Sequence, residues 1–279
     1  MRIGFIGAGN VGFTLAKYIN DKYHNVCGIY SKNIDDAKDC AKFSISEYYS
    51  SLKEIVDSCD TLFLTVNDDQ IKYVVKELID IKCNNKILIH TSGSISSEVF
   101  MGLLDNNSCY SLHPIYAFND KYNSYKDFSN AYLTLEGNNL DKVDEIKDLF
   151  DRKVVLIDSC NKSRYHAGCV MISNLVCSLV DIGYDLFKSI GINDLSIFNP
   201  LIKNNIDNIL NVGTKDALTG PIRRCDIETV KKHLDVLTDE EKEIYIRLSL
   251  KLVDISKELN NSDYSKIYDL LKGELKWLQ

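Results

Sequence analysis

The sequence predicts an α/β domain built on a parallel sheet, residues 1–158, followed by an all-α domain, residues 159–279. Three observations favour this fold class. Short apolar runs alternate with stretches of helical spacing up to residue 158, which is typical of parallel strands joined by crossover helices. A glycine-rich turn follows the first apolar run, and only helical patterns follow Lys162. A chain of 279 residues is long enough for two such cores.

The first strand and its turn lie between Arg2 and Gly12. An apolar run ends in the spacing Gly-x-Gly-x-x-Gly, and a helical pattern continues to Ile19. This order of strand, turn and helix is the dinucleotide-binding fingerprint of a Rossmann-like domain, although an ordinary glycine-rich turn is the alternative. Its glycines permit a tight turn, a close approach of the backbone to a pyrophosphate, and close packing of the helix on the strand. The cofactor-binding residues predicted here are Gly7, Ala8, Gly9, Asn10, Val11 and Gly12.

The next strands predict which nucleotide binds. Asn25 to Tyr30 reads as a second strand, and the position after it carries Ser31 and Lys32 in place of the acidic residue that usually binds the ribose of NAD. We therefore expect NADP(H), with a solvated loop lysine as the alternative interpretation. A buried strand from Thr61 to Val66 follows, and its end adds Thr65, Val66 and Asn67 to the predicted cofactor site. Asp68 or Asp69 is expected to cap the next helix rather than to act as a catalytic carboxylate.

Two further strand ends offer polar groups. Lys86 to His90 precedes a loop in which Ser92 and Gly93 are placed to hold a substrate carboxylate or carbonyl. The alternative is a capping turn for a helix from Ser96 to Leu104. His113 precedes a proline, which disfavours helical backbone, so its imidazole is expected on an extended segment with either a functional or a structural role. Two closing strands, Ala131 to Glu136 and Val154 to Ile157, complete the predicted sheet.

A nearly continuous helical pattern runs from Lys162 to Ile190. At about 100° per residue, Lys162, His166 and Ser173 fall on one stripe, and Asn174 lies next to it. We expect this stripe to face the active site, and internal hydrogen bonding at a seam between helices is the alternative. The segment from Ala167 to Val180 is apolar almost all round, so it is predicted to be buried and to join two copies as a homodimer. It reads as too short to span a bilayer.

The remaining helices are expected at Leu195 to Val212, Ile227 to Val236, Asp239 to Leu259 and Asp263 to Lys272. A compact polar loop separates the first two. It carries Thr219 and Arg224 as candidate substrate contacts, because a guanidinium binds a carboxylate as a fork. A plain surface arginine is the alternative. Asp226 is expected to cap the helix that follows.

Composition excludes several classes of protein. The net charge of −7 argues against a nucleic-acid surface, which needs clustered basic residues. The nine cysteines are scattered and include no Cys-x-x-Cys pair, so we expect neither a disulfide framework nor a metal site, but reduced thiols in the cytoplasm. Gly7, Gly9, Asn10 and Gly12 interrupt the first apolar run, so it is not expected to be a signal peptide. No membrane partner is expected.

Several motifs, in the order in which they occur, resemble a family of NADP oxidoreductases. They are Gly-Ala-Gly-Asn-Val-Gly, Tyr-Ser-Lys, Thr-Val-Asn-Asp-Asp, His-Thr-Ser-Gly-Ser, Ser-Leu-His-Pro, Tyr-His-Ala, Ser-Asn and Leu-Thr-Gly-Pro-Ile-x-Arg-x-Asp. Members of that family pair a Rossmann-like domain with a helical C-terminal domain of unknown function, and some look like an alternative ketopantoate reductase of pantothenate synthesis. The wider relatives are the hydroxyisobutyrate and 6-phosphogluconate dehydrogenases and pyrroline-carboxylate reductase. The resemblance covers nearly the whole chain and is most specific around Thr219.

The resemblance implies a cleft between two domains, with the first C-terminal helix facing the nicotinamide. Several relatives use a lysine of that helix as an acid and a nearby asparagine, and the corresponding region here offers Lys162, His166 and Asn174, with a different lysine spacing. The His-Pro step at His113 also resembles that of prephenate dehydrogenases, whose histidine bonds the reacting hydroxyl. One departure is Cys225, where glycine is commoner in the family.

These observations together predict an NADPH-dependent reductase of a small 2-keto acid, with 2-dehydropantoate (ketopantoate) as the first candidate. The expected proton donor is His166, with His113 as its competitor and Asn174 orienting the substrate; Lys162 is the third candidate. The alternative enzyme is a prephenate-like or hydroxy-acid dehydrogenase. The alternative outside enzymology is a nucleotide-sensing regulator that has kept the fold without the chemistry.

Overall fold

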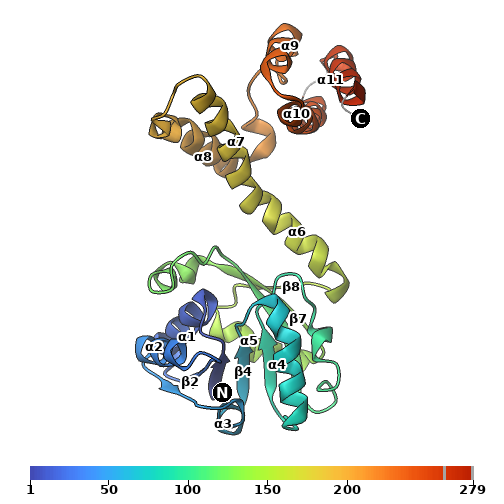
Figure 1. The fold of residues 1–279 in the computed structure, drawn as a ribbon. Coiled ribbons are helices and arrows are strands. Elements are labelled where there is room, and N and C mark those ends of the chain that lie inside the picture. Colours follow the sequence, from blue (N-terminus) through green and yellow to red (C-terminus); the bar gives the residue numbers. More distant parts are fainter. Residues whose placement is uncertain (260–261, 278–279) are drawn as a thin grey trace. The chain divides into compact units, whose positions relative to one another are not determined.

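The computed structural model describes residues 1–259 and 262–277. The chain divides into two compact units, Met1–Asn174 and Leu175–Gln279. The first unit is α/β and the second is helical throughout its described residues, so the predicted fold class is confirmed (Figure 1). Helix α6, Lys162–Ile172, groups with the first unit, whereas the sequence assigned it to the second domain.

The first unit is organised around one sheet whose eight described strands run in the order β3-β2-β1-β4-β5-β6-β7-β8. All neighbouring strands are parallel except β6 and β7. The order reverses at β1, so the carboxyl ends of β1 and β4 form the switch point at which dinucleotide folds bind their ligand. The strands are β1 Ile3–Ile6, β2 Val26–Tyr30, β3 Glu47–Tyr48, β4 Thr61–Leu64, β5 Ile87–His90, β6 Ser108–Ile115, β7 Tyr132–Gly137 and β8 Val154–Leu156.

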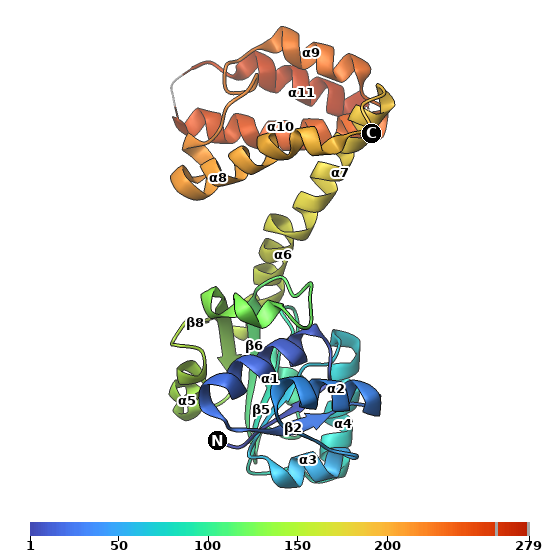
Figure 2. The same ribbon diagram turned by 90° about the vertical axis from the view of Figure 1, so that its left-hand side faces the viewer.

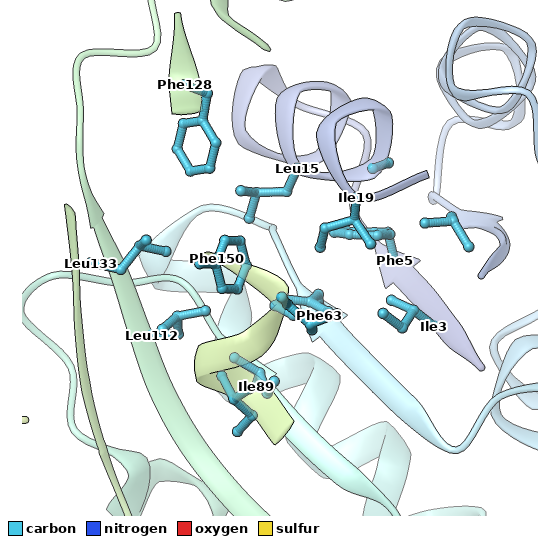
Figure 3. Close-up of a cluster of buried hydrophobic side chains, with 14 of the residues drawn as sticks. Ile3, Phe5, Leu15, Ile19, Phe63, Ile89, Leu112, Phe128, Leu133 and Phe150 are labelled. Atoms are coloured by element: carbon cyan, nitrogen blue, oxygen red, sulfur yellow. The ribbon is translucent and has the colours of Figure 1, made fainter. Parts of the chain in front are cut away.

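Helices cover both faces of this sheet (Figure 2). The helices are α1 Asn10–Tyr23, α2 Ile34–Ser44, α3 Leu52–Ser58, α4 Asp68–Asp80 and α5 Val143–Leu149. Helices α1, α2 and α5 pack on one face, and α3 and α4 pack on the other. Side chains of a strand alternate between faces, so Phe5 joins the first core and Ile6 the second. In the first core, the ring of Phe5 stacks on that of Phe63 with 5.1 Å between centroids (Figure 3).

The segment after β5 differs from the prediction. A helix was expected from Ser96 to Leu104, but only a single 3-10 turn forms, at Ser97–Phe100. The backbone N–H and the hydroxyl of Ser97 both donate to the buried carboxylate of Glu136 on β7, at 2.6 and 2.7 Å. Those bonds hold the start of the turn against the sheet. Gly102, with φ +93°, lies two residues beyond the turn.

The second unit contains α7 Asn174–Ser189 except for its first residue, together with α8 Asn199–Asp216, α9 Ile227–Val236, α10 Asp239–Leu259 and α11 Ser265–Trp277. A 3-10 turn at Leu195–Phe198 precedes α8. The buried core of this unit is formed by Ile222 and by side chains of α9, α10, α11 and the segment before α11. Asp226 caps α9, as predicted, because its carboxylate accepts the backbone N–H of Thr229 at 3.1 Å.

The apolar segment from Ala167 to Val180 is half-exposed or exposed at every residue of the single chain, so the prediction that it is a buried helix is wrong for an isolated copy. It is also interrupted, because Ser173 has non-helical backbone angles between α6 and α7. By length and composition alone, the helical stretch Ser159–Ser189 is long and apolar enough to cross a membrane. The segment from Ala167 to Val180, which was expected to be too short for a bilayer, is only the apolar middle of this stretch. A single such helix is weak evidence for a membrane span.

Candidate functional site

The glycine-rich turn has the geometry that a bound pyrophosphate needs. Gly7 has φ +111°, and a Cβ there would lie 2.8 Å from the backbone of Thr65 and Val66. A Cβ on Gly12 would clash with the carbonyl oxygen of Gly7, which lets α1 start close to β1. At Gly9 the nearest atom to such a Cβ is 4.0 Å away, so this side of the turn is open. Helix α1 has no side-chain cap and no acidic residue in its first turn, and its N–H groups are therefore available to an anion.

A cavity of about 300 Å³ lies against this turn, at the carboxyl ends of β1, β2 and β4. Eight of its lining residues are predicted cofactor contacts: Gly7, Ala8, Gly9, Ser31, Lys32, Thr65, Val66 and Asn67. The ammonium of Lys32 lies 3.7 Å from the Glu77 carboxylate in an exposed pair. An open glycine face, an uncapped helix start and a lysine fit a dinucleotide phosphate group.

Three predicted residues lie at the edge of this site. Asn10 uses its side-chain amide to donate to the carbonyl oxygen of Phe118 at 2.8 Å, so it fixes the loop between β6 and β7. Val11 packs against the core and Gly12 supports the turn. Asn33, which the sequence placed next to Lys32, is committed elsewhere, because its side chain caps α2.

We expect Lys32→Ala to weaken NADPH binding by about 1.5–3 kcal/mol, since a contact between a lysine and a phosphate contributes about that much. NADH lacks the 2′-phosphate, so its affinity should change little. Fluorescence titration of both reduced cofactors measures this. Lys38→Ala removes a lysine of α2 that lies outside the cavity and is the matched control. Equal affinities for NADPH and NADH in the unmodified protein would contradict the prediction.

The loop after β5 is organised by Asp68. The hydroxyls of Ser92 and Ser94 donate to its carboxylate at 2.7 and 3.0 Å. The Ser92 hydroxyl oxygen in turn accepts the backbone N–H groups of Ser94 and Ile95. The prediction that Asp68 or Asp69 caps α4 is wrong, because both lie in the first turn and Asn67 holds the cap position. Asn67 also lines the cofactor cavity, so consecutive residues connect that cavity to the serine loop.

Lys162 lies buried at the start of α6. Its ammonium donates to the carbonyl oxygen of Ser92 at 2.9 Å and to the hydroxyl of Ser111 on β6 at 2.6 Å. Among the described residues, no carboxylate lies within ion-pair distance of it. Burial lowers its pKa to about 8, against smaller raising effects of Glu136 and Asp68. A buried ammonium with one unused donor favours an anionic ligand or a developing negative charge.

The imidazoles of His113 and His166 lie side by side next to Gly93. Their ring centroids are 5.6 Å apart and their planes nearly perpendicular. A Cβ on Gly93 would clash with His166 and lie 2.8 Å from Nε2 of His113, so only glycine lets both rings approach this loop. Burial lowers the pKa of His113 to about 4, with further lowering by the charges of Lys162 and His166. His113 is therefore a neutral imidazole at physiological pH.

His90, at the end of β5, has a structural role. Its Nδ1 accepts the backbone N–H of Ser92 at 3.3 Å, and its Nε2 lies 3.3 Å from the carbonyl oxygen of Ser96. Both ring nitrogens are thus used within the loop. Burial lowers the pKa of His90 to about 4, which keeps the ring neutral. The histidine fixes the serine loop and offers nothing to a ligand.

The structure brings together only part of the predicted stripe on the long helix. Lys162 and His166 join the cluster with Ser92, Gly93 and His113, but Ser173 and Asn174 are exposed and bond to each other. Asn174 lies about 18 Å from Lys162 along the helix at 1.5 Å per residue. Because of this rise, Asn174 does not lie beside Lys162 in the first unit, although its angular position on the helix is next to the predicted stripe.

Thr219 and Arg224 belong to the second unit, and both are exposed. Gly220 has φ +94° in this loop. Arg223, the neighbour of Arg224, donates to the carbonyl oxygen of Leu218 and so closes the end of α8. Cys225 has φ +54°, a left-handed conformation that glycine adopts without strain, which accounts for the glycine expected there from the resemblance.

Sequence reasoning assigned no role to Ser111 or Tyr165, although both contact the cluster. Ser111 lies two residues before His113 on β6, so strand alternation places them on the same face. The phenol of Tyr165 lies 2.7 Å from Nδ1 of His113. Tyr165 follows Lys162 by three residues, the spacing of neighbours on one helix face. Both periodicities were available from the sequence.

Two family models match the sequence of this chain. Residues 2–93 match a family model described as NADP oxidoreductase, coenzyme F420-dependent. Residues 131–252 match a domain of unknown function, DUF2520. No curated protein matches the sequence.

The solved structures that share the fold include the following three. A protein from Bacteroides fragilis classed as an NADP oxidoreductase is 23% identical, with a TM-score of 0.72, and 90% of this chain aligns with 97% of that one. Pyrroline carboxylate reductase of Plasmodium falciparum, with NADP bound, is 17% identical over 92% of this chain and 96% of its own, with a TM-score of 0.56. Prephenate dehydrogenase of Aquifex aeolicus is 15% identical over 93% and 98%, with a TM-score of 0.55.

Proposed function

We propose that this chain, which combines an NADP oxidoreductase domain with a DUF2520 domain, is an NADPH-dependent reductase of a small 2-keto acid. The observation that carries the proposal is the connection between two parts of the first unit. Asn67 lines the cofactor cavity, and the next residue, Asp68, holds the serine loop beside His113, His166 and Lys162. Groups that donate protons and bind anions therefore adjoin the place where the nucleotide would bind. The first candidate substrate is 2-dehydropantoate, which would be reduced to pantoate in the cytoplasm.

In this proposal NADPH, when bound at Gly7 to Gly12, supplies the hydride. Reduction of a ketone leaves negative charge on the substrate oxygen, and a proton must reach it. His166 gives that proton. His113, as a neutral imidazole, donates a hydrogen bond to the same oxygen. The ammonium of Lys162 stabilises negative charge in a site with little water.

The substrate carboxylate needs its own contacts. The loop at Ser92 and Gly93 offers backbone N–H groups and hydroxyls. Thr219 and Arg224 of the second unit remain proposed carboxylate contacts, and Asn174 remains a proposed orienting residue. Arg224 suits this role chemically because a guanidinium binds a carboxylate with two parallel hydrogen bonds.

A prephenate-like or hydroxy-acid dehydrogenase is the second candidate. It is supported by His113, which stands at a strand end before Pro114, and by the likeness in fold to a prephenate dehydrogenase. A nucleotide-sensing regulator is less well supported, because it would not need a buried lysine and two imidazoles beside the nucleotide cavity.

The test is NADPH consumption against a panel of small 2-keto acids, with 2-dehydropantoate first, alongside NADP reduction by prephenate and small hydroxy acids. Turnover of a keto acid supports the proposal. Turnover only in the oxidative direction supports the dehydrogenase. Tight NADPH binding with no turnover on either panel would point to the regulator.

We also propose that two copies associate through the helical unit. Its α7 and α8 leave large apolar side chains exposed in the single chain, including Leu175, Leu179, Leu201 and Leu210. Monomeric proteins rarely expose apolar patches of more than a few hundred Å². We expect light scattering at low micromolar concentration to give the mass of a dimer, and Leu210→Glu to shift it toward the monomer. A monomer in the unmodified protein would contradict this.

A further inference from the structure

The hydrogen bond between Tyr165 and His113 decides what His113 can do. The phenol oxygen lies 2.7 Å from Nδ1, and the two rings are close to perpendicular. A bond to Nδ1 leaves Nε2 as the nitrogen available to a ligand. In a neutral imidazole one nitrogen carries the proton and the other is an acceptor, so the role of Nδ1 sets that of Nε2.

The direction of this bond follows from the chemistry of the two groups. Burial raises the pKa of Tyr165, so its phenol keeps its proton at physiological pH. The pKa of His113 falls to about 4, so its ring has one acceptor nitrogen. A phenol O–H is a stronger acid than the N–H of a neutral imidazole, and an imidazole nitrogen is a better acceptor than a phenol oxygen. The phenol therefore donates to Nδ1, and the imidazole proton lies on Nε2.

Nε2 of His113 faces Gly93. A Cβ on Gly93 would lie 2.8 Å from it, so glycine at this position is what lets the ring approach the loop. Within residues 1–259 and 262–277, Nε2 has no hydrogen-bond partner. The open donor thus points to the loop at which a substrate oxygen is proposed to bind.

We propose that Tyr165 is a positioning residue that holds His113 in the tautomer with the proton on Nε2. His113 then acts as a hydrogen-bond donor to the substrate oxygen and cannot act as a base there. The tautomer itself is a property of the free protein, whereas its use on a substrate oxygen rests on the proposed reductase function.

The experiment is nitrogen NMR on protein labelled with ¹⁵N in its histidines, near neutral pH and without substrate. The two tautomers give different patterns of protonated and unprotonated ring nitrogens, and His113→Gln identifies the signals of His113. We expect the Nε2-protonated pattern in the unmodified protein. We expect a mixture of both tautomers in Tyr165→Phe. Tyr132→Phe, which removes an exposed hydroxyl on β7, is the matched control and should change nothing.

An Nδ1-protonated His113 in the unmodified protein, or an unchanged pattern in Tyr165→Phe, would overturn the proposal. With a keto acid that is turned over, Tyr165→Phe should raise KM about two- to tenfold, which corresponds to one neutral hydrogen bond, and leave kcat nearly unchanged, as expected for a residue that acts through His113. An unaltered KM would overturn the part of the proposal that concerns the substrate. If no keto acid is turned over but the tautomer pattern appears as expected, the proposed function fails while the positioning role of Tyr165 stands.

Discussion

His166→Gln should lower kcat by about 10²–10⁴-fold, because removal of a general acid typically costs that factor. The structure leaves His166 as the leading imidazole. His113 is half-buried and neutral, and its Nδ1 is held by Tyr165, so it has no additional proton to give. His166 is also half-buried, and its ring lies against Gly93 of the serine loop. Glutamine keeps the approximate size and polarity without the acid.

His113→Gln should act mainly on KM, because a lost contact in the ground state raises KM more than it lowers kcat. Both parameters are measured by NADPH consumption with the best keto acid. The control is His24→Asn, which replaces an exposed histidine whose left-handed backbone, φ +52°, asparagine tolerates. A near-normal kcat in His166→Gln with a collapse in His113→Gln would reverse the two roles. Activity retained in both would make Lys162 or a bound water the donor.

Local sequence patterns were sufficient for most of the fold. Parallel strands buried on both faces read as apolar runs, so β1, β2, β4 and β5 could be located within one or two residues. The turn at Gly7 was predictable because its backbone conformation excludes a side chain. Strand β3, only Glu47–Tyr48, was not predicted, because both side chains are exposed and carry no apolar signal.

The site was only partly predictable. The order of strands and helices along the chain indicates that the ends of the strands and the start of α6 converge. This convergence brings together Ser92, Gly93, His113, His166 and Lys162. Helical angles do not measure distance along an axis, and for that reason Asn174 was grouped with residues about 18 Å away. Periodicity also cannot distinguish a helix covered by its own chain from one left for a partner, which is why the segment after Ala167 was expected to be buried.

Lys162→Met should stabilise the protein by about 2–4 kcal/mol at pH 7 while it impairs catalysis. The ammonium is buried without a carboxylate in contact, and its pKa falls from an ordinary value of 10.5 to about 8. A pKa lowered to about 8 corresponds to about 3 kcal/mol that the folded state loses by keeping the charge. Methionine fills a similar volume without charge. The carbonyl oxygen of Ser92 keeps the hydroxyl of Ser111 as a donor at 3.2 Å, so no buried group is left unpaired.

The pH dependence of the stability difference distinguishes the loss of the buried charge from a change in packing alone. Between about pH 8 and 10.5 the unfolded chain keeps a proton on Lys162 that the folded protein has lost, so the wild type gains stability as pH rises through this window. Burial raises the pKa of three thiols to about 12, so these thiols lower the stability of both proteins as pH rises above 9. They belong to Cys40, Cys59 and Cys109. The difference between variant and wild type therefore isolates the lysine.

Urea unfolding at pH 7 and at pH 10 measures that difference. We expect a higher midpoint for Lys162→Met at pH 7 and a much smaller advantage at pH 10. Lys53→Met removes an exposed lysine of α3 that pairs with Asp57, and should stay within about 0.5 kcal/mol of the wild type at both pH values. A variant that is less stable than the wild type at pH 7 would mean that Glu136 and Asp68 outweigh the burial of the ammonium. Lys162 would then be a structural cation, and only the imidazoles would take part in proton transfer.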